Sequence, residues 1–407
     1  MKLCKQLKIK EYSIYFRLAV FTFLSFIFSV DYGIDVLIDN EFSELADKRV
    51  GVLANTSSIN KQGKNIVDIL INNKNFSLIK IFAPEHGFAS NYSAGEQFSD
   101  GNYRKIKIIS LYGNNKKPKY RDVADLDVIV IDIQDIGSTY YTYISTVTYM
   151  LEIAAKYNIS VIILDRPNPM GRTIYGPKKE KFNFIGLHPI PIRHGMTIGE
   201  LCYMINNEGW LNNKIKDLKV IKMRDFKKIN DFNHWFPPSP NIPDLKTAFI
   251  YNGMCLFEGT NLSEGRGTIY PFRTIGAPWV DSDNLMNHIK YLKDTKYGNK
   301  VIIKESEFIP IPNKGAKKPK YVNQTCYGIF IEYIDKSIEP IDLAIDLLSY
   351  FNHYNDFSFK ESFFDILYGN SDLRLSITNI DNLDKIISNI KEDVIEFNKV
   401  REKYLLY

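Results

Sequence analysis

The run Val128-Ile129-Val130-Ile131, which ends directly in Asp132-Ile133-Gln134-Asp135, decides the fold class of this chain. Short β-branched runs that end in polar residues are typical of buried strands in a parallel sheet. Three further runs share this design: Val50 to Ala54 ends at Asn55, Leu78 to Ala83 ends at Pro84-Glu85-His86-Gly87, and Val161 to Leu164 ends at Asp165-Arg166-Pro167-Asn168-Pro169. The sequence therefore predicts an α/β fold with a doubly wound, mostly parallel sheet.

Helical patterns separate the predicted strands, as parallel pairing requires. Apolar residues recur at helical spacing in Ile66 to Ile71 and in Tyr141 to Tyr157. A further helix is predicted over Thr197 to Glu208. Thr197 is its expected N-cap, and Glu200, three residues on, completes a capping box.

The second half of the chain predicts loops and then a smaller α+β domain. Phe236 to Pro243 is too rich in proline for a helix or a central strand and predicts a rigid loop. The remaining predicted elements are a strand at Ala248 to Tyr251, a glycine-rich loop at Glu258 to Thr268, a strand at Gly328 to Tyr333, and helices at Ile341 to Phe351 and Leu383 to Tyr404. We therefore expect a catalytic domain over residues 34–272 and an auxiliary domain over residues 273–407.

Composition excludes some classes of function. The chain has 407 residues, of which 45% are hydrophobic, so it can bury a large core and favours two domains over one. Its net charge of +5 is spread along the chain, apart from small clusters such as Lys116-Lys117 and Lys317-Lys318. A nucleic-acid-binding protein needs a basic stripe, so we expect no nucleic-acid partner. A mildly basic protein can still favour an anionic substrate.

Motifs for metal and nucleotide binding are missing from the sequence. The cysteines, Cys4, Cys202, Cys255 and Cys326, lack the spacing of a metal site or a disulfide framework, so buried free thiols are expected. No GxxxxGK[ST] or GxGxxG motif follows a predicted strand, which disfavours a nucleotide-dependent enzyme. We expect neither a metal ion nor a cofactor.

The N-terminal segment 1–33 resembles a signal peptide or a signal anchor. Lys2, Lys5, Lys8 and Lys10 precede an apolar run from Leu18 to Val30. This order is typical of a secretory signal, and the run is short for a membrane span. We expect export to the periplasm or the cell exterior, with an uncleaved signal that tethers the chain to the membrane as the alternative.

The ligand crevice of a doubly wound sheet lies outside the carboxyl ends of its strands. We therefore expect the polar strand ends to converge on one cleft, which would contain Glu85, His86, Asp132, Asp135, Asp165 and Arg166. A cleft rich in carboxylates, with an imidazole and a guanidinium beside them, indicates a hydrolase.

Long motifs in a fixed order link the chain to one enzyme family. They are Pro84 to Gly87, Asp132 to Gly137 with Tyr140 to Ile144, Asp165 to Pro169, Arg193 to Thr197, Pro237 to Asn241, and Glu258 to Thr268. In these motifs the chain resembles the exo-β-N-acetylmuramidase (NamZ-like) family, formerly a domain of unknown function, from about Val50 to Tyr407. The resemblance implies a Rossmann-like catalytic domain, a smaller auxiliary domain, and release of N-acetylmuramic acid from the non-reducing end of peptidoglycan-derived muropeptides or disaccharides.

A glycosidase needs a carboxylic acid that protonates the departing glycosidic oxygen, and Glu85 is our candidate for that acid. Alternatively, Glu85 caps a helix or pairs with an arginine. His86 tunes Glu85, binds a sugar hydroxyl, or makes a structural hydrogen bond. The second catalytic group is Asp132, Asp135 or Glu264, or the 2-acetamido group of the substrate.

Substrate recognition would use the arginines and amides of the same motifs. A guanidinium matches the lactyl carboxylate of muramic acid, which makes Arg166, Arg193 and Arg266 candidates, although an arginine can also brace a neighbouring acid. The other substrate-binding candidates are Asn55, Tyr141, Asp165, His194, Asn241 and Asn261. A non-catalytic muropeptide-binding protein on the same scaffold is the alternative function.

Overall fold

The computed structural model describes residues 30–88, 100–226, 235–377 and 380–407. The predicted signal before Val30 and Cys4 lie outside the described residues. Residues 30–33, the last part of the predicted signal segment 1–33, belong to the folded body: Val30 is buried, and Asp31 forms ion pairs with Lys61 and Arg224. The fold described below therefore begins at Val30.

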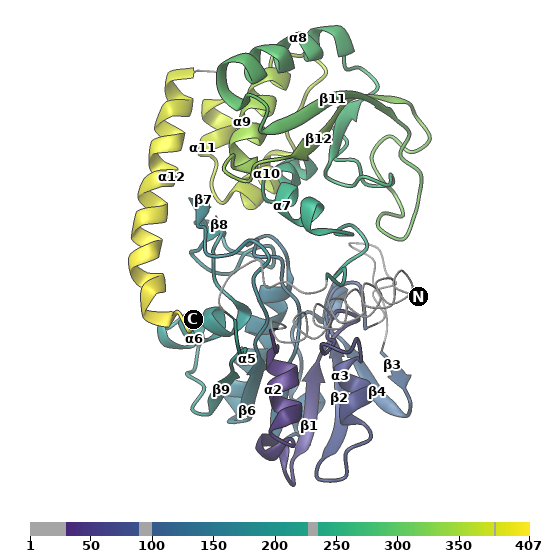
Figure 1. Ribbon diagram of the computed structural model, residues 1–407, viewed down its shortest axis with the longest axis vertical. Helices are drawn as coiled ribbons and strands as arrows, with labels where there is room; N and C mark the ends of the chain where they lie inside the picture. The colour runs from purple at the N-terminus through teal and green to yellow at the C-terminus, as the bar shows by residue number, and fades with distance from the viewer. Residues whose placement is uncertain (1–29, 89–99, 227–234, 378–379) are drawn as a thin grey trace, which may run out of the picture.

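A seven-stranded sheet forms the lower half of the molecule in Figure 1. All four predicted strands are confirmed, as β1 (Arg49–Leu53), β2 (Ser77–Ala83), β5 (Val128–Ile131) and β6 (Ser160–Leu164). The structure adds β3 (Gly101–Tyr103), β4 (Ile106–Ser110) and β9 (Leu218–Ile221). The strand order is β3-β4-β2-β1-β5-β6-β9, and only the β3–β4 pair is antiparallel. The order of the parallel strands is that of a doubly wound Rossmann sheet, which confirms the predicted fold class.

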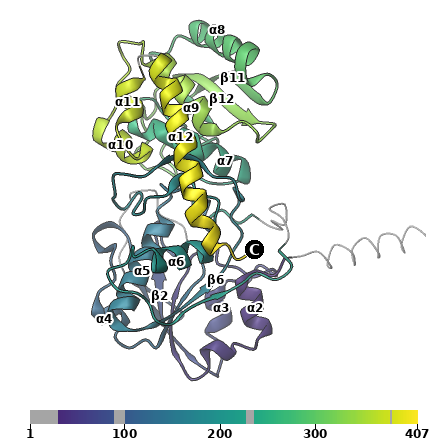
Figure 2. The same cartoon turned by 90° about the vertical axis from the view of Figure 1, so that its left-hand side faces the viewer.

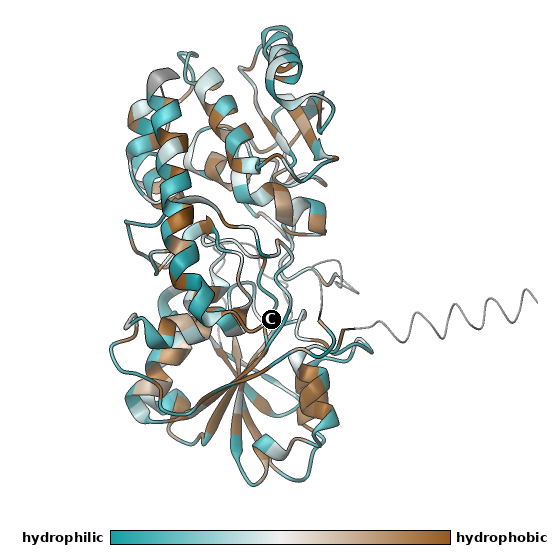
Figure 3. Ribbon diagram, turned by 60° about the vertical axis from the view of Figure 1, so that its left-hand side comes forward, coloured by the Kyte–Doolittle hydropathy of each residue, from teal (hydrophilic) through white to brown (hydrophobic). Residues whose placement is uncertain are grey.

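Helices cover both faces of this sheet, which explains why its central strand β5 is apolar along its whole length. In β5, Val128 and Val130 belong to one buried core, whereas Ile129 and Ile131 belong to the other. Figure 3 shows these apolar strands in brown, with helices beside them. The covering helices include α2 (Gly33–Asp39), α3 (Ile66–Leu70), α4 (Tyr120–Val123), α5 (Tyr143–Tyr157) and α6 (Ile198–Asn207).

The three helices predicted in this half are confirmed as α3, α5 and α6. The capping box of α6 is also confirmed, because Thr197 Oγ1 accepts a hydrogen bond from Glu200 N at 3.2 Å and Glu200 Oε2 accepts one from Thr197 N at 2.9 Å. Each predicted helix agrees with the observed one to within two residues at either end.

The upper half of the molecule is smaller and contains an antiparallel sheet and helices. Its strands are β10 (Thr274–Ala277), β11 (Val301–Phe308) and β12 (Cys326–Tyr333), in the order β10-β12-β11. Around them lie α8 (Ser282–Leu292), α9 (Pro340–Phe351), α10 (Glu361–Tyr368) and α11 (Asp372–Ser376). The predicted strand at Gly328 to Tyr333 and the predicted helix at Ile341 to Phe351 are confirmed.

The strand predicted at Ala248 to Tyr251 is wrong, because these residues lie inside α7 (Leu245–Met254). Asp244 caps this helix by accepting a hydrogen bond from Thr247 N at 2.7 Å. Every residue from Thr247 to Met254 is buried, so α7 lacks the polar face that marks a helix in sequence. A short apolar run without such a face fits a buried strand equally well.

A long C-terminal helix joins the two halves (Figure 2). This helix, α12 (Ile380–Arg401), confirms the prediction for Leu383 to Tyr404 and continues into a short turn, η6 (Glu402–Tyr404). It packs against β7 (Tyr175–Lys178) and β8 (Pro191–Arg193), which form a two-stranded sheet. In the described part of the chain, no helix is long and apolar enough to cross a membrane.

Candidate active site

Several motifs that lie far apart in sequence meet at one pocket. The pocket encloses about 340 Å³ of space, part of it open to solvent. It lies where the carboxyl end of β2 meets the start of α5, the proline-rich loop and the glycine-rich loop that follows α7. The lining residues are Glu85, His86, Tyr140, Tyr141, Thr142, Ser239, Asn241, Ile242, Tyr251, Arg266 and Phe272.

The carboxylate of Glu85 is held at the edge of this pocket. Thr142 Oγ1, at the N-cap position of α5, donates a hydrogen bond to Glu85 Oε2 at 2.6 Å. Glu85 therefore accepts a hydrogen bond from a hydroxyl group at the start of a helix, where the helix dipole stabilises a negatively charged carboxylate. Its side chain is half-buried, so a ligand in the pocket can reach it.

Two residues that line the pocket have strained backbone conformations. His86 has φ of +71° and Phe272 has φ of +61°, although neither is glycine. A left-handed conformation costs a bulky residue free energy, and such strain clusters at functional sites. These two positions are far apart in the sequence, and both lie at this pocket.

Arg266 reaches the pocket from a loop in which the two flanking residues are glycines with positive φ. Gly265 and Gly267 flank it with φ of +74° and +85°. A Cβ on Gly265 would lie 2.7 Å from Thr274 O, and a Cβ on Gly267 would lie 2.7 Å from Pro319 Cγ. The predicted glycine-rich loop is therefore confirmed as a tightly packed turn that presents one arginine.

Charged residues behind Arg266 form a compact cluster. Arg266 Nη2 donates to Glu258 Oε1 at 2.5 Å, and Lys320 Nζ lies 2.9 Å from Glu264 Oε2. Burial raises the pKa of Glu258 despite the nearby guanidinium. Burial acts on Glu264 in the same direction, but Lys320 and Arg266 hold the pKa of Glu264 below its ordinary value. Of these two acids, Glu258 therefore takes up a proton more readily.

Asp132 and Arg166 form a buried ion pair away from the pocket lining. Arg166 Nε donates to Asp132 Oδ1 at 2.5 Å, and Nη2 donates to Oδ2 at 2.9 Å. Arg166 Nη2 also donates to Ile59 O at 2.8 Å. The side chains are 3% and 0% exposed for Arg166 and Asp132, and neither residue lines the pocket.

Asp135 and His194 are buried neighbours at the carboxyl end of β5. Asp135 Oδ2 accepts from Gly137 N at 2.7 Å and lies 3.6 Å from His194 Nε2. His194 Nδ1 accepts from Met196 N at 3.2 Å, so its Nε2 carries the proton if the ring is neutral. Neither residue is part of the pocket lining.

The other predicted site residues brace the fold. Arg193 binds both carboxylate oxygens of Glu339 at 2.9 Å, and this pair joins β8 to the start of α9. Asn261 holds the loop at residues 356–358 through its amide. Asn55 donates to Tyr143 Oη at 2.8 Å, and buried Asp165 accepts hydrogen bonds from the start of α6. Of the residues predicted to form the site, Glu85, His86, Tyr141, Asn241 and Arg266 line the pocket.

Some pocket residues were not identified from sequence. Thr142, Ser239 and Tyr251 line the pocket, and Glu258 stands behind Arg266. Glu258 is the first residue of the predicted glycine-rich loop, and this position in the motif could have identified it as a candidate site residue. Tyr251 was hidden because it belongs to the helix that was predicted as a strand.

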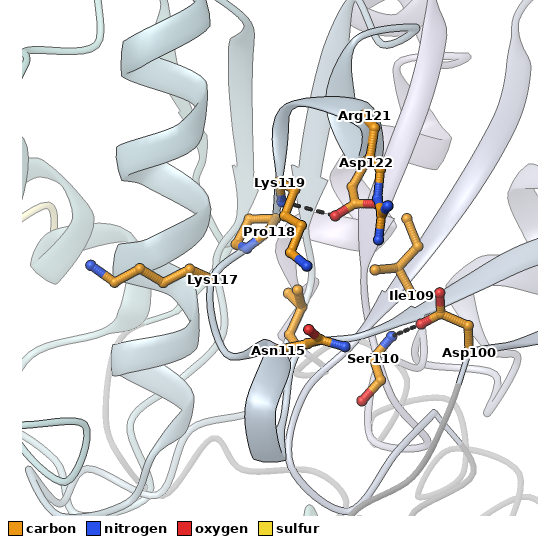
Figure 4. A pocket seen from close by; sticks show the side chains of 10 residues that line it. Asp100, Ile109, Ser110, Asn115, Lys117, Pro118, Lys119, Arg121 and Asp122 are labelled. Atoms are coloured by element: carbon orange, nitrogen blue, oxygen red, sulfur yellow. Dashed lines mark hydrogen bonds and ion pairs between the residues drawn. The ribbon is translucent and has the colours of Figure 1, made fainter.

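A second cavity, of about 280 Å³, lies beside the end of β4 (Figure 4). Two of its cationic side chains have acidic partners: Arg121 Nε lies 3.8 Å from Asp122 Oδ1, and Lys117 Nζ lies 3.4 Å from Glu152 Oε2. None of the site residues predicted from sequence lines this cavity.

The described cysteines and acids do not assemble a metal-binding group. Cys202, Cys255 and Cys326 are buried free thiols, as predicted. No cluster of three or more histidine, cysteine, aspartate or glutamate side chains that could hold a metal ion occurs among the described residues. The absence of a cofactor stays a prediction.

Comparisons with known proteins agree on one family. The N-terminal and C-terminal models of exo-β-N-acetylmuramidase NamZ match residues 50–246 and 249–407. The peptidoglycan β-N-acetylmuramidase NamZ of Bacillus subtilis (strain 168) is 35% identical over 391 residues, which are 93% of this chain and 91% of the relative.

Two crystal structures of DUF1343 family proteins from Bacteroides fragilis NCTC 9343 share the fold. One has a TM-score of 0.82 with 28% identity, and the other has a TM-score of 0.74 with 32% identity. Each comparison covers 93% of this chain and 99% of the other. With both family models matched in order along its length, the chain belongs to the exo-β-N-acetylmuramidase NamZ family.

Proposed function

We propose that this chain is an exo-acting glycoside hydrolase that releases N-acetylmuramic acid from the non-reducing end of peptidoglycan fragments. The observation that carries the proposal is the meeting of Glu85 and Arg266 in one pocket of a chain that belongs to this family. A muramidase needs an acid at the glycosidic oxygen and a cation for the lactyl carboxylate, and this pocket offers one of each.

In the proposed reaction, Glu85 is the general acid. It gives its proton to the glycosidic oxygen as the bond to the anomeric carbon breaks. Thr142 holds the carboxylate in place through the 2.6 Å hydrogen bond. The second group is either a carboxylate near the pocket or the 2-acetamido group of the substrate, which attacks the anomeric carbon before water completes hydrolysis.

Arg266 is the proposed binding group for the lactyl carboxylate. Arg166, Arg193 and Arg266 each pair with an acid, and of these three Arg266 alone lines the pocket. His86, Tyr141 and Asn241 lie around the same space and are the proposed contacts for the sugar ring and its hydroxyl groups.

The test is hydrolysis of a chromogenic β-N-acetylmuraminide by the purified chain, with and without EDTA. We expect activity that EDTA does not change and that Glu85→Gln lowers by roughly 10²- to 10⁴-fold. Binding of N-acetylmuramic acid without hydrolysis would contradict the proposal and favour the muropeptide-binding alternative. Loss of activity in EDTA, with recovery on addition of Zn²⁺, would contradict the metal-free part.

We also propose that the chain acts outside the cytoplasmic membrane, because its charged and then apolar N-terminus resembles a secretory signal. Since Val30 and Asp31 pack into the folded body, we place any cleavage before Val30. Fractionation of cells that express the full chain would test this. Intact chain recovered mainly from the cytoplasm would contradict it.

A further inference from the structure

The pocket wall carries one permanent positive charge. Among the described residues that line the pocket, that charge is the guanidinium of Arg266. Its Cζ lies 5.2 Å from the centroid of the Phe272 ring, which also lines the pocket. The guanidinium is therefore fixed on one side by an aromatic ring.

A carboxylate fixes the same guanidinium from behind. Arg266 Nη2 donates to Glu258 Oε1 at 2.5 Å, and the Glu258 side chain is 17% exposed. Arg266 Nε is buried and faces a second acid, Glu264, whose Oε1 lies 3.9 Å away. Since a guanidinium has five N–H donors, Arg266 retains donors for a second anion while Glu258 holds it.

The loop that carries these residues is itself anchored. Lys320 Nζ donates to Phe257 O and to Leu262 O, each at 2.7 Å, and these carbonyls lie on either side of Glu258 in sequence. The Cys255 Sγ atom lies 3.7 Å from Glu258 Oε1 and supplies a weak donor from the same turn. Glu258 is therefore held in place before any ligand arrives.

We propose that Glu258 is a positioning residue that orients Arg266 toward the lactyl carboxylate of the substrate. The inference rests on the proposed function. Glu258 does not line the pocket, so it acts through Arg266 rather than on the sugar. A guanidinium that is already oriented loses less conformational entropy when it binds a ligand. The resulting increase in affinity applies only to a ligand that carries the carboxylate.

The experiment measures calorimetric Kd values for N-acetylmuramic acid and N-acetylglucosamine, which differ in the lactyl group. Glu258→Leu should weaken N-acetylmuramic acid binding by roughly 10-fold or more. Glu258→Gln should cost less, roughly 3-fold, because the amide oxygen still accepts from Arg266 but carries no charge. For N-acetylglucosamine, both variants should bind within roughly 2-fold of the wild type.

Glu339→Gln is the matched control. Glu339 holds Arg193 at 2.9 Å, and Arg193 Cζ lies 5.4 Å from the Phe249 ring, so the pair repeats the chemistry of Glu258 and Arg266 away from the pocket lining. We expect this variant to keep the wild-type ratio of the two Kd values. A change in that ratio for Glu339→Gln, without one for Glu258→Gln, would overturn the proposal.

A purely structural role for Glu258 would weaken both sugars equally, and that result would also overturn the proposal. If the Tm shows that Glu258→Leu does not fold, the ratio of the two Kd values in Glu258→Gln tests the proposal instead. The failure of the proposed function gives a different result. In that case the wild-type chain hydrolyses no muraminide, whereas failure of the inference leaves wild-type hydrolysis intact and the Kd ratio unchanged in the Glu258 variants.

Discussion

At the scale of single residues, the first prediction concerns Glu85. Glu85→Gln should lower kcat by roughly 10²- to 10⁴-fold with little change in KM, because a general acid acts on a proton that moves only in the transition state. The amide keeps the size of the side chain and can still accept the hydrogen bond from Thr142. Steady-state kinetics on a chromogenic muraminide would measure both constants.

Asp132→Asn provides the contrast for Glu85→Gln. Removing one charge of the buried pair with Arg166 leaves the other uncompensated, which costs about 3–5 kcal/mol of stability. We therefore expect a lower Tm for Asp132→Asn and a Tm close to the wild type for Glu85→Gln. Near-normal kcat in Glu85→Gln, with a folded but inactive Glu264→Gln variant, would show that the acid is misassigned.

Sequence identifies which strand ends carry polar residues but not which of them meet a ligand. Glu85 and Asp132 both follow buried strands, and the same pattern predicted both for one cleft. In the structure Glu85 lines the pocket, whereas Asp132 meets Arg166. The difference depends on a partner 34 residues away in sequence. A local pattern contains no information about such a partner.

At the scale of secondary-structure elements, Gly253 tests how α7 meets α9. A Cβ at Gly253 would lie 2.0 Å from Pro340 O and 2.8 Å from Ile341 N, so the two helices cross at backbone contact. Gly253→Ala should lower the free energy of unfolding by roughly 1–3 kcal/mol. Helix propensity alone predicts the opposite sign, a gain of about 1 kcal/mol.

The control for Gly253→Ala is Gly101→Ala in β3. A Cβ at Gly101 meets nothing within 4 Å, so we expect a change of no more than about 1 kcal/mol. Urea unfolding of both variants would measure the difference. A Gly253→Ala variant as stable as the wild type would show that the crossing adjusts easily.

Elements with strong local signals were predictable from sequence, and elements defined by their surroundings were not. The α6 helix has a capping box in its own residues, and its ends were predicted to within one residue. The α7 helix has buried residues on every side because α9 and β12 pack against it. Its helical period is therefore absent from the hydrophobic pattern.

At the scale of the whole molecule, the sequence predicted the type of sheet but not how the chain closes on itself. Four apolar runs were enough for a doubly wound sheet. The return of α12 and the tail to the first half could not be predicted, because it depends on contacts between distant segments. Leu406 N donates to Glu200 Oε1 at 2.8 Å, and Tyr407 Oη donates to Asp165 Oδ2 at the same distance.

The last prediction concerns Asp165, where the sheet, α6 and the C-terminal tail meet. Its carboxylate is fully buried and accepts hydrogen bonds from Thr197 Oγ1 at 2.8 Å, Gly199 N at 2.9 Å and Tyr407 Oη at 2.8 Å. Burial raises the pKa of Asp165 from 3.8 to about 6. Between these values the folded state binds the proton more tightly than the unfolded state, so the contribution of Asp165 to stability is present below about pH 4 and is lost as the pH rises through 6.

A shift of this size corresponds to roughly 3 kcal/mol. The wild type should therefore lose roughly that much stability relative to Asp165→Asn between pH 4 and pH 7, because the amide does not titrate. Urea unfolding of both proteins across this range would measure the difference. Asp127→Asn is the control: Arg49 lowers the pKa of Asp127 to about 2, so its titration lies below this window and the slope should match that of the wild type. Parallel stability curves for the wild type and Asp165→Asn would mean that Asp165 stays charged where the three segments meet, because its hydrogen-bond donors outweigh the cost of burial.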